Sequence, residues 1–213
     1  MSNTASVVRA PAQYFALLVG AGLLLLAALH AVSSFILLRP AGHLAVLTTQ
    51  YQQAQAVFPQ GETGAALAAL KIAAAQRGQA SWPEAQAALE NALQLRPQDP
   101  LSWARLAYVY SHENRLDLLE TALVRSLQTG PYMPGFMQWR FILSLRYWAS
   151  FNHETRQLVA GQARMIWHGK PNDFIRLARM PALSSQIEQL VKEYLPLESA
   201  AFLQRRGRLR HTL

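Results

Sequence analysis

The sequence predicts an all-α protein in which an N-terminal transmembrane helix precedes an α-solenoid of helical hairpins. A long run near the N-terminus contains no charged residue. Beyond it, apolar residues recur at intervals of three and four, the spacing of one helix face, and no alternating strand pattern competes. Matching residues also recur 34 positions apart, for example Pro97 and Pro131. A repeat of that length is typical of stacked helix pairs.

The charge-free run predicts the membrane segment. Between Arg9 and Arg39 lie 29 residues without Asp, Glu, Lys or Arg. About 20 apolar helical residues suffice to cross a bilayer. The apolar core is longer than the roughly 7–15 residues of a cleavable signal peptide, and no small-x-small cleavage motif follows it. We therefore expect a short tail at 1–13 and an uncleaved single-pass anchor at 14–38.

The orientation of this anchor depends on few charges. One arginine flanks each end of the segment, and the N-terminal amine tips the balance toward a cytoplasmic N-terminus. We therefore expect the chain to reside in the inner (cytoplasmic) membrane, with its C-terminal domain in the periplasm.

Composition excludes several classes of function. The chain has no cysteine, which excludes a disulfide scaffold, a cysteine-ligated metal centre and a thiol nucleophile. Its net charge of +8 suggests nucleic acid at first sight. Yet residues 61–204 hold 14 basic and 12 acidic groups, and four arginines lie within 205–210. Because no broad basic face remains, we predict no nucleic-acid partner and interpret residues 197–213 as a basic C-terminal tail.

Helix boundaries are legible from residues that cap helices. The tetrapeptide Ser81–Glu84 has capping-box spacing, with a proline in the first turn. Asp99 before a proline and Asn152 mark two further starts, and Lys170-Pro171 marks a break. Outside the repeats we expect helices at about 41–58, 134–149, 153–168, 171–180 and 183–195.

The repeats resemble the tetratricopeptide repeat. That family has the pattern W-x2-L-G-x2-Y, followed by small and aromatic positions in a second helix and then a proline. The second unit matches at Trp103, Leu106, Ala107, Tyr110, Leu119, Leu123, Ser126 and Pro131; the first matches at Ile72, Ala73, Ala85, Leu89, Ala92 and Pro97. Alanine replaces the glycine at 73 and 107, and Leu119 stands where a small residue is expected, which predicts looser packing there.

The resemblance places a TPR-like helical domain at 62–196, preceded by a juxtamembrane helix or linker at 39–61. Whether the latter extends the membrane helix or folds back as a repeat helix stays open. Repeat arrays of this family bind partner proteins along a groove lined by their first helices. By repeat position the groove residues are Leu67, Leu70, Ala74, Arg77, Leu101, Ala104, Arg105, Tyr108, Ser111 and His112. This groove is apolar with a few basic groups, which suits a helix or a hydrophobic peptide.

The catalytic motifs that begin in this sequence each lack a required residue. His112-Glu113 and His153-Glu154 begin H-E-x-x-H, but neither has the second histidine that zinc requires. No phosphate-binding glycine loop and no G-x-S-x-G motif occurs. We predict no enzyme, no cofactor and no metal. The alternative of a membrane-bound enzyme requires one of these histidines to meet a carboxylate cluster in space.

The overall layout resembles small membrane-anchored proteins of exopolysaccharide-biosynthesis loci. The likeness includes the stretches 97–131 and 136–171 and the Gly-Pro-Tyr turn at 130–132. It implies a scaffolding or adaptor role in polysaccharide assembly or export. The alternative is an assembly factor for another envelope complex, in cytochrome maturation or cell division. The sequence leaves the partner, the polymer and the oligomeric state open.

Overall fold

The computed structural model describes residues 44–57 and 61–208, and this part of the chain is all-helical, without a β-strand. Proline or a capping side chain starts five of these α-helices: α4, α5, α8, α9 and α11. The α-helices are α2 (Leu44–Val57), α3 (Gly61–Gln76), α4 (Trp82–Leu95), α5 (Pro100–His112), α6 (Leu116–Thr129), α7 (Met137–Arg146), α8 (His153–Gly169), α9 (Pro171–Ala178), α10 (Ser184–Tyr194) and α11 (Pro196–Arg208). A short 3-10 helix, Trp148–Ser150, follows α7.

The predicted membrane segment at 14–38 and the tail at 1–13 lie outside the described residues. Of the helices within the described ranges, none is both long and apolar enough to cross a membrane. The chain divides into two units, 1–50 and 51–213. This boundary falls inside α2, which begins at Leu44 within the predicted juxtamembrane segment.

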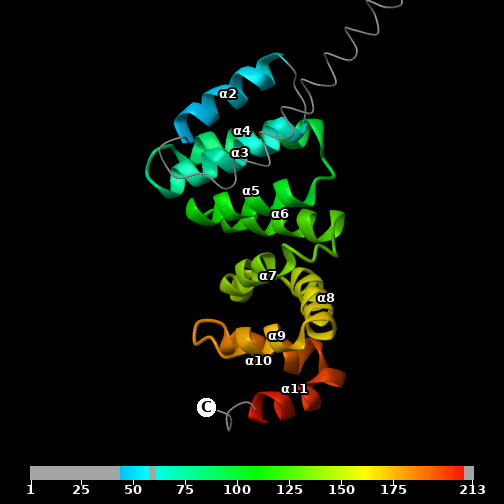
Figure 1. Ribbon diagram of the computed structural model, residues 1–213. Helices are drawn as coiled ribbons and strands as arrows, with labels where there is room; N and C mark the ends of the chain where they lie inside the picture. Colours follow the sequence, from blue (N-terminus) through cyan, green and yellow to red (C-terminus); the bar gives the residue numbers. More distant parts are fainter. Residues whose placement is uncertain (1–43, 58–60, 209–213) are drawn as a thin grey trace, which may run out of the picture. The chain divides into compact units, whose positions relative to one another are not determined.

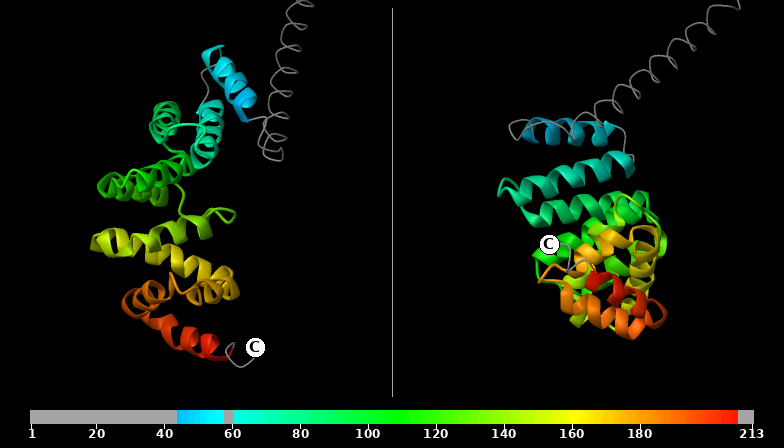
Figure 2. Two further views of the ribbon diagram at one scale, coloured as in Figure 1. Left: turned by 90° about the vertical axis from the view of Figure 1, so that its left-hand side faces the viewer. Right: turned by 60° about the horizontal axis from the view of Figure 1, so that its bottom comes forward.

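In the second unit, helices adjacent in sequence pack against each other. Helix α3 packs on α4 and α5 packs on α6, and these two hairpins meet through α4 and α5. Helix α7 then packs on α8, α9 on α10, and α11 on both α9 and α10, so that chain order is also the order in space (Figures 1 and 2). The helices expected on the C-terminal side of the repeats are confirmed as α7 to α10.

At three predicted helix starts, the side chain of the capping residue accepts a backbone hydrogen bond, as expected. The Ser81 hydroxyl accepts a hydrogen bond from the Glu84 N–H at 3.4 Å. The Asp99 carboxylate accepts from the Leu101 N–H at 3.2 Å, and the Asn152 side chain accepts from the Thr155 N–H at 2.9 Å. Each cap satisfies a backbone donor that has no partner within its helix.

The repeat positions form the interior of the hairpins. Ala85 and Ala107 are completely buried, and such small side chains allow the helix backbones to approach closely. Leu119 is completely buried as well, so the hairpin accommodates leucine at this position without exposing it. The ring of Trp103 is partly buried, and its Nε1–H donates to the Pro97 carbonyl at 2.7 Å.

A buried arginine joins the second hairpin to the helices that follow. Arg140 on α7 has no exposed surface. Its guanidinium donates to the carbonyl oxygens of Ser126 (2.7 Å), Gly130 (2.9 Å) and Pro131 (3.2 Å), at the end of α6. With the Gln162 amide turned so that its oxygen faces the guanidinium, that oxygen accepts from Nη2 and Nε at 2.6 and 2.9 Å. Arg140 thus supplies donors to carbonyls that a helix terminus leaves without partners.

The segment predicted as a basic C-terminal tail contains structured residues. Helix α11 extends to Arg208, and Phe202 on it is buried in the core. The Phe202 ring packs edge-on against Trp167 and Phe174, at centroid distances of 6.2 and 5.9 Å. The prediction rested on the arginines of this segment and therefore missed a helix with one buried aromatic residue.

Candidate functional site

A cluster of aromatic side chains joins residues of three helices, α4, α5 and α7. We call it the aromatic cluster; it comprises Trp82, Tyr108, His112, Phe136 and Trp139. Trp82 is the first residue of α4, Tyr108 and His112 lie one turn apart on α5, Phe136 caps α7 and Trp139 lies in its first turn. Three helices from separate parts of the sequence therefore contribute to one surface.

Ring contacts connect all five members of the aromatic cluster. The His112 ring stacks on Trp82 at 4.0 Å between centroids and 8° between planes. Tyr108 meets His112 edge-on at 4.6 Å and contacts Trp139 at 5.5 Å, and Trp139 contacts Phe136 at 4.9 Å. Such arrangements stabilise aromatic pairs by about 0.5–1.5 kcal/mol beyond their burial. The rings are thus held in place before any partner arrives.

The aromatic cluster nevertheless remains accessible. Trp139 is 37% exposed, His112 is exposed, and the other three rings are half-buried. Its central member is held by polar contacts: the Tyr108 hydroxyl accepts from the Gln76 amide at 2.9 Å, and the Tyr108 carbonyl accepts from the Ser111 hydroxyl at 2.6 Å. A partly exposed and rigidly held set of rings is typical of a binding surface, because little side-chain entropy is lost on binding.

The charge around the aromatic cluster is basic. Burial lowers the pKa of His112, and the positive charge of Arg146 lowers it further, so this imidazole is neutral at pH 7. Arg105, one turn before Tyr108, points back to α3 and donates to the Ala65 carbonyl at 3.3 Å. Burial also lowers the pKa of Arg105, although Asp99 opposes that shift.

The structure divides the residues predicted to line the groove into two groups. Leu67, Ala74 and Ala104 are buried, with at most 8% of their surface exposed, so they pack in the core and offer no surface to a partner. The accessible ones are Leu70, Arg77, Leu101, Arg105, Tyr108, Ser111 and His112. Of these, Tyr108 and His112 belong to the aromatic cluster.

Three members of the aromatic cluster were not predicted as binding residues. Trp82 was noted only within a capping box, and neither Phe136 nor Trp139 was predicted to bind a partner. Trp139 is 37% exposed. Their position in the sequence could have indicated exposure. Phe136 and Trp139 lie at the start of α7, shortly after a Gly-Pro turn, and a helix terminus at such a turn often lies at the surface.

The second histidine singled out in the sequence has a different environment. His153 lies 3.1 Å from the Tyr194 hydroxyl through Nδ1 and 2.9 Å from the Gln157 amide nitrogen through Nε2. It lines an open depression of about 640 Å³ together with Glu193, whose carboxylate accepts from Gln189 at 3.0 Å. Across residues 44–57 and 61–208, no three His, Asp or Glu side chains gather as metal ligands would.

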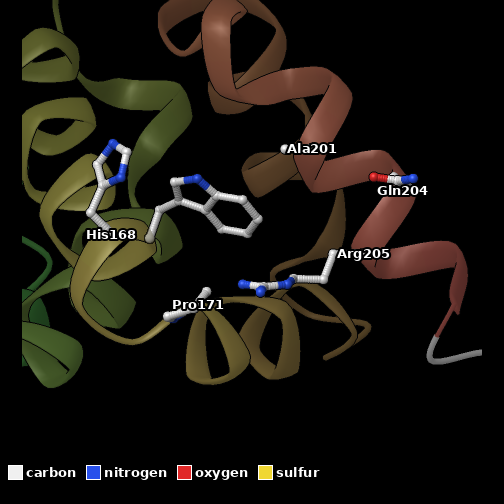
Figure 3. A pocket seen from close by; sticks show the side chains of 6 residues that line it. His168, Pro171, Ala201, Gln204 and Arg205 are labelled. Carbon is white, nitrogen blue, oxygen red and sulfur yellow. The ribbon is translucent and has the colours of Figure 1, made fainter.

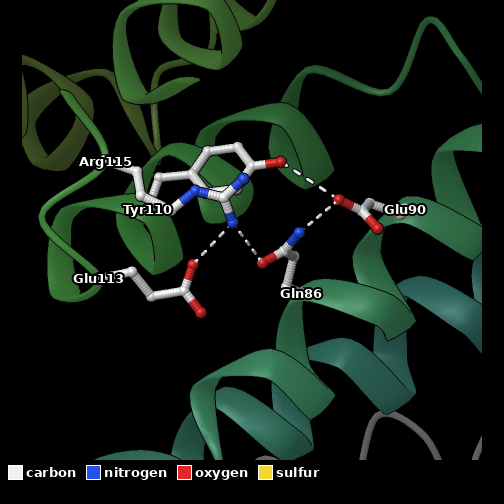
Figure 4. A network of polar contacts seen from close by, with 5 residues as sticks. All are labelled: Gln86, Glu90, Tyr110, Glu113 and Arg115. Carbon is white, nitrogen blue, oxygen red and sulfur yellow. Dashed lines mark hydrogen bonds and ion pairs between the residues drawn. The ribbon is translucent and has the colours of Figure 1, made fainter. Parts of the chain in front are cut away.

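A polar network ties the two hairpins together on another face (Figure 4). The Tyr110 hydroxyl donates to Glu90 at 3.2 Å, and burial, followed by the charge of Glu90, raises the Tyr110 pKa to about 12. The Arg115 guanidinium lies 5.1 Å from the Tyr110 ring centroid and contacts both Gln86 and Glu113. Its groups satisfy one another, so this network is a structural contact between α4 and α5.

Fold and site together define an all-α protein of packed helical hairpins with an accessible aromatic cluster. A comparison of the chain with family models, with curated proteins and with solved structures found no match. The functional conclusion therefore rests on the residues themselves.

Proposed function

We propose that this protein is a membrane-anchored adaptor whose TPR-like helical hairpins bind a partner protein at the aromatic cluster. The single observation that carries the proposal is the accessible, pre-positioned set of rings contributed by α4, α5 and α7. Trp and Tyr are enriched among the residues that dominate binding energy at protein interfaces. Residues 14–38 supply the anchor in this proposal, and the domain that follows them is periplasmic.

The partner segment that suits this surface is a helix or an extended hydrophobic peptide. Trp139, supported by both Phe136 and Tyr108, is still 37% exposed and can contact an apolar side chain at little entropic cost. His112 is neutral, and the exposed Arg146 on α7 acts on it electrostatically. The exposed Arg77 directly follows Gln76, whose amide contacts the Tyr108 hydroxyl, so the rim is basic. A partner with apolar anchors and flanking acidic residues complements such a rim.

We place the protein in polysaccharide assembly or export, as an accessory factor without catalytic activity. The layout of one anchor, helical repeats and a further helical pair supports this process through its resemblance to membrane-anchored proteins of exopolysaccharide loci. Deletion is expected to abolish secreted polymer while glycosyltransferase activity in the lysate is retained. Continued polymer secretion by the deletion strain would refute the assignment to this process.

The aromatic cluster is tested separately by complementation of the deletion strain. Trp139→Ala removes an accessible ring and is expected to leave the protein at wild-type level yet fail to restore polymer. The matched control is Tyr132→Ala, because Tyr132 is 69% exposed and lies outside the aromatic cluster. Equal restoration by both variants would show that the aromatic cluster is not the binding surface.

Crosslinking gives a direct readout of the same surface. A photoreactive residue at position 139 is expected to yield one discrete adduct in intact cells, whereas the same residue at position 132 yields none. A reporter fused after Leu213 tests the compartment: activity restricted to the periplasm agrees with the proposed orientation, and activity in the cytoplasm reverses it.

A further inference from the structure

A pocket of about 400 Å³ lies between the end of α8, the start of α9 and the outer face of α11. It is distinct from the aromatic cluster, and its lining includes Pro171 of the predicted helix break and Arg205 of the predicted basic tail. Its size falls within the range of small-molecule sites, about 300–1,000 Å³. The residues that line it are Trp167, His168, Pro171, Ala201, Gln204 and Arg205 (Figure 3).

One side chain that lines this pocket, Arg205, brings hydrogen-bond donors that have no acceptor among the described residues. Figure 3 shows the Arg205 side chain reaching from α11 toward Pro171. The guanidinium carbon lies 5.8 Å from the Trp167 ring centroid, within cation–π distance. Among the contacts of the described residues, neither the guanidinium of Arg205 nor the indole N–H of Trp167 has a hydrogen-bond acceptor. Both groups are therefore available to a ligand.

Two carboxylates on the helices around the pocket pair with cations other than Arg205. Glu198 Oε1 accepts from the Arg164 guanidinium at 3.0 Å and lies 3.5 Å from His168 Nε2, while its buried Oε2 has no hydrogen-bond partner among the described residues. Although burial alone raises the pKa of Glu198, the hydrogen bond from Arg164 makes the net shift a lowering, so this carboxylate stays charged. On α9, Asp173 pairs with Arg176 at 2.7 Å. Neither of these carboxylates forms an ion pair with Arg205.

Part of the remaining lining is apolar, beside the polar side chains of His168 and Gln204. Pro171 and Ala201 contribute hydrocarbon groups to the lining. Trp167 contributes part of a flat ring, since 8% of this residue is exposed. A carboxylate accepts two parallel hydrogen bonds from one guanidinium, which fixes its orientation. A ligand with an apolar body attached to that carboxylate meets both kinds of wall at once.

We propose that this pocket binds an organic anion in which a single carboxylate is attached to a flat, apolar body. The guanidinium of Arg205 holds the carboxylate, and the body lies against Trp167, Pro171 and Ala201. This inference does not depend on the proposed adaptor role, because it uses a different set of helices.

The test uses the full-length chain labelled with 15N at its tryptophan indoles. The Trp167 resonance is assigned from its absence in the Trp167→Phe variant, and ligands are titrated against it. The probes are phenylacetate, which has both charge and apolar body; 2-phenylethanol, which lacks the charge; and inorganic phosphate, which lacks the body. We expect saturable shifts of this resonance by phenylacetate with a Kd on the order of 1 mM, and at least tenfold weaker effects of the other two.

Variants of the pocket cation decide whether Arg205 is responsible. Arg205→Gln is expected to weaken phenylacetate binding at least tenfold, whereas Arg205→Lys, which keeps the charge, retains part of the affinity. The matched control Arg125→Gln changes an exposed arginine on α6 and should leave the affinity unchanged. Unchanged thermal unfolding of Arg205→Gln shows that the loss is local. Binding of Arg205→Gln equal to the wild type, equal shifts by phosphate, or no saturation by phenylacetate would each overturn the proposal.

Discussion

Replacement of Arg140 by methionine tests how the repeat hairpins are joined to the C-terminal helices. This guanidinium is completely buried and its acceptors are carbonyl, hydroxyl and amide oxygens, with no carboxylate among its described contacts. Burial lowers the pKa of Arg140 to about 10, so the group is still charged at neutral pH. Methionine keeps an apolar stem of similar reach and removes every donor.

The stability lost in Arg140→Met depends on which acceptors lose their hydrogen-bond donor. The Ser126 carbonyl also accepts from the Gly130 N–H at 3.2 Å, so it keeps one partner. The Gly130 and Pro131 carbonyls and the buried Gln162 oxygen have Arg140 as their donor, and water can reach the exposed Pro131. Two hydrogen bonds to a charged group, at about 1.5–3 kcal/mol each, therefore set the loss. Because the turn after α6 can relax toward water, we expect the loss of unfolding free energy to lie at the lower end of this range, about 3 kcal/mol.

The assay is reversible unfolding by heat and by urea. For a chain of this size, about 3 kcal/mol lowers Tm by about 6–12 °C. The matched control is Arg146→Met on the same helix, because Arg146 is exposed and its replacement should change the unfolding free energy by less than about 0.5 kcal/mol. Arg140→Lys, which retains the charge without the planar fork, should fall between the two. A buried charge can also be a net cost, so an Arg140→Met variant as stable as the wild type would refute the reasoning.

Further predictions concern backbone packing and pH. Gly130→Ala should destabilise the fold by about 1–3 kcal/mol, because an added Cβ would come within 2.6 Å of the rigid Pro100 ring; urea unfolding measures this. Gly161→Ala within α8 meets nothing within 4 Å and should instead stabilise by about 0.5–1 kcal/mol; a loss of stability there would contradict the helix packing described. Because the folded pKa of His112 lies below its ordinary 6.5, the unfolded chain binds more protons below that pH, so stability falls as pH drops from 7 to 5. His112→Gln should lose this part of the pH dependence, and an NMR titration midpoint of His112 at or above 6.5 would contradict it.

The helical elements could be predicted because their signals are local. The hydroxyl of Ser81 and the carboxylate of Asp99 mark helix starts through hydrogen bonds to residues two or three positions away. The break at Lys170-Pro171 likewise separates α8 from α9. Periodicity of three and four residues identifies a helix without knowledge of its neighbours.

The candidate site could be predicted only in part. Tyr108 and His112 were identified because repeat position assigns α5 one outward face. Ala104 was assigned to the same face, yet it is completely buried, because repeat position alone does not say how closely a neighbouring helix covers it. Trp82 was missed as a binding residue, since its partner His112 lies 30 positions further along the chain.

What the sequence determined by itself, then, was the all-helical class, the helix boundaries and the hairpin spacing, all consequences of interactions within one or two turns. Tertiary structure alone decided that the Trp82 and His112 rings stack, that Arg140 serves carbonyls at the end of α6, and that Arg205 faces a pocket beside Trp167. The physical reason is that these side chains meet across helices, where the angle and distance between axes depend on packing of the whole set of side chains.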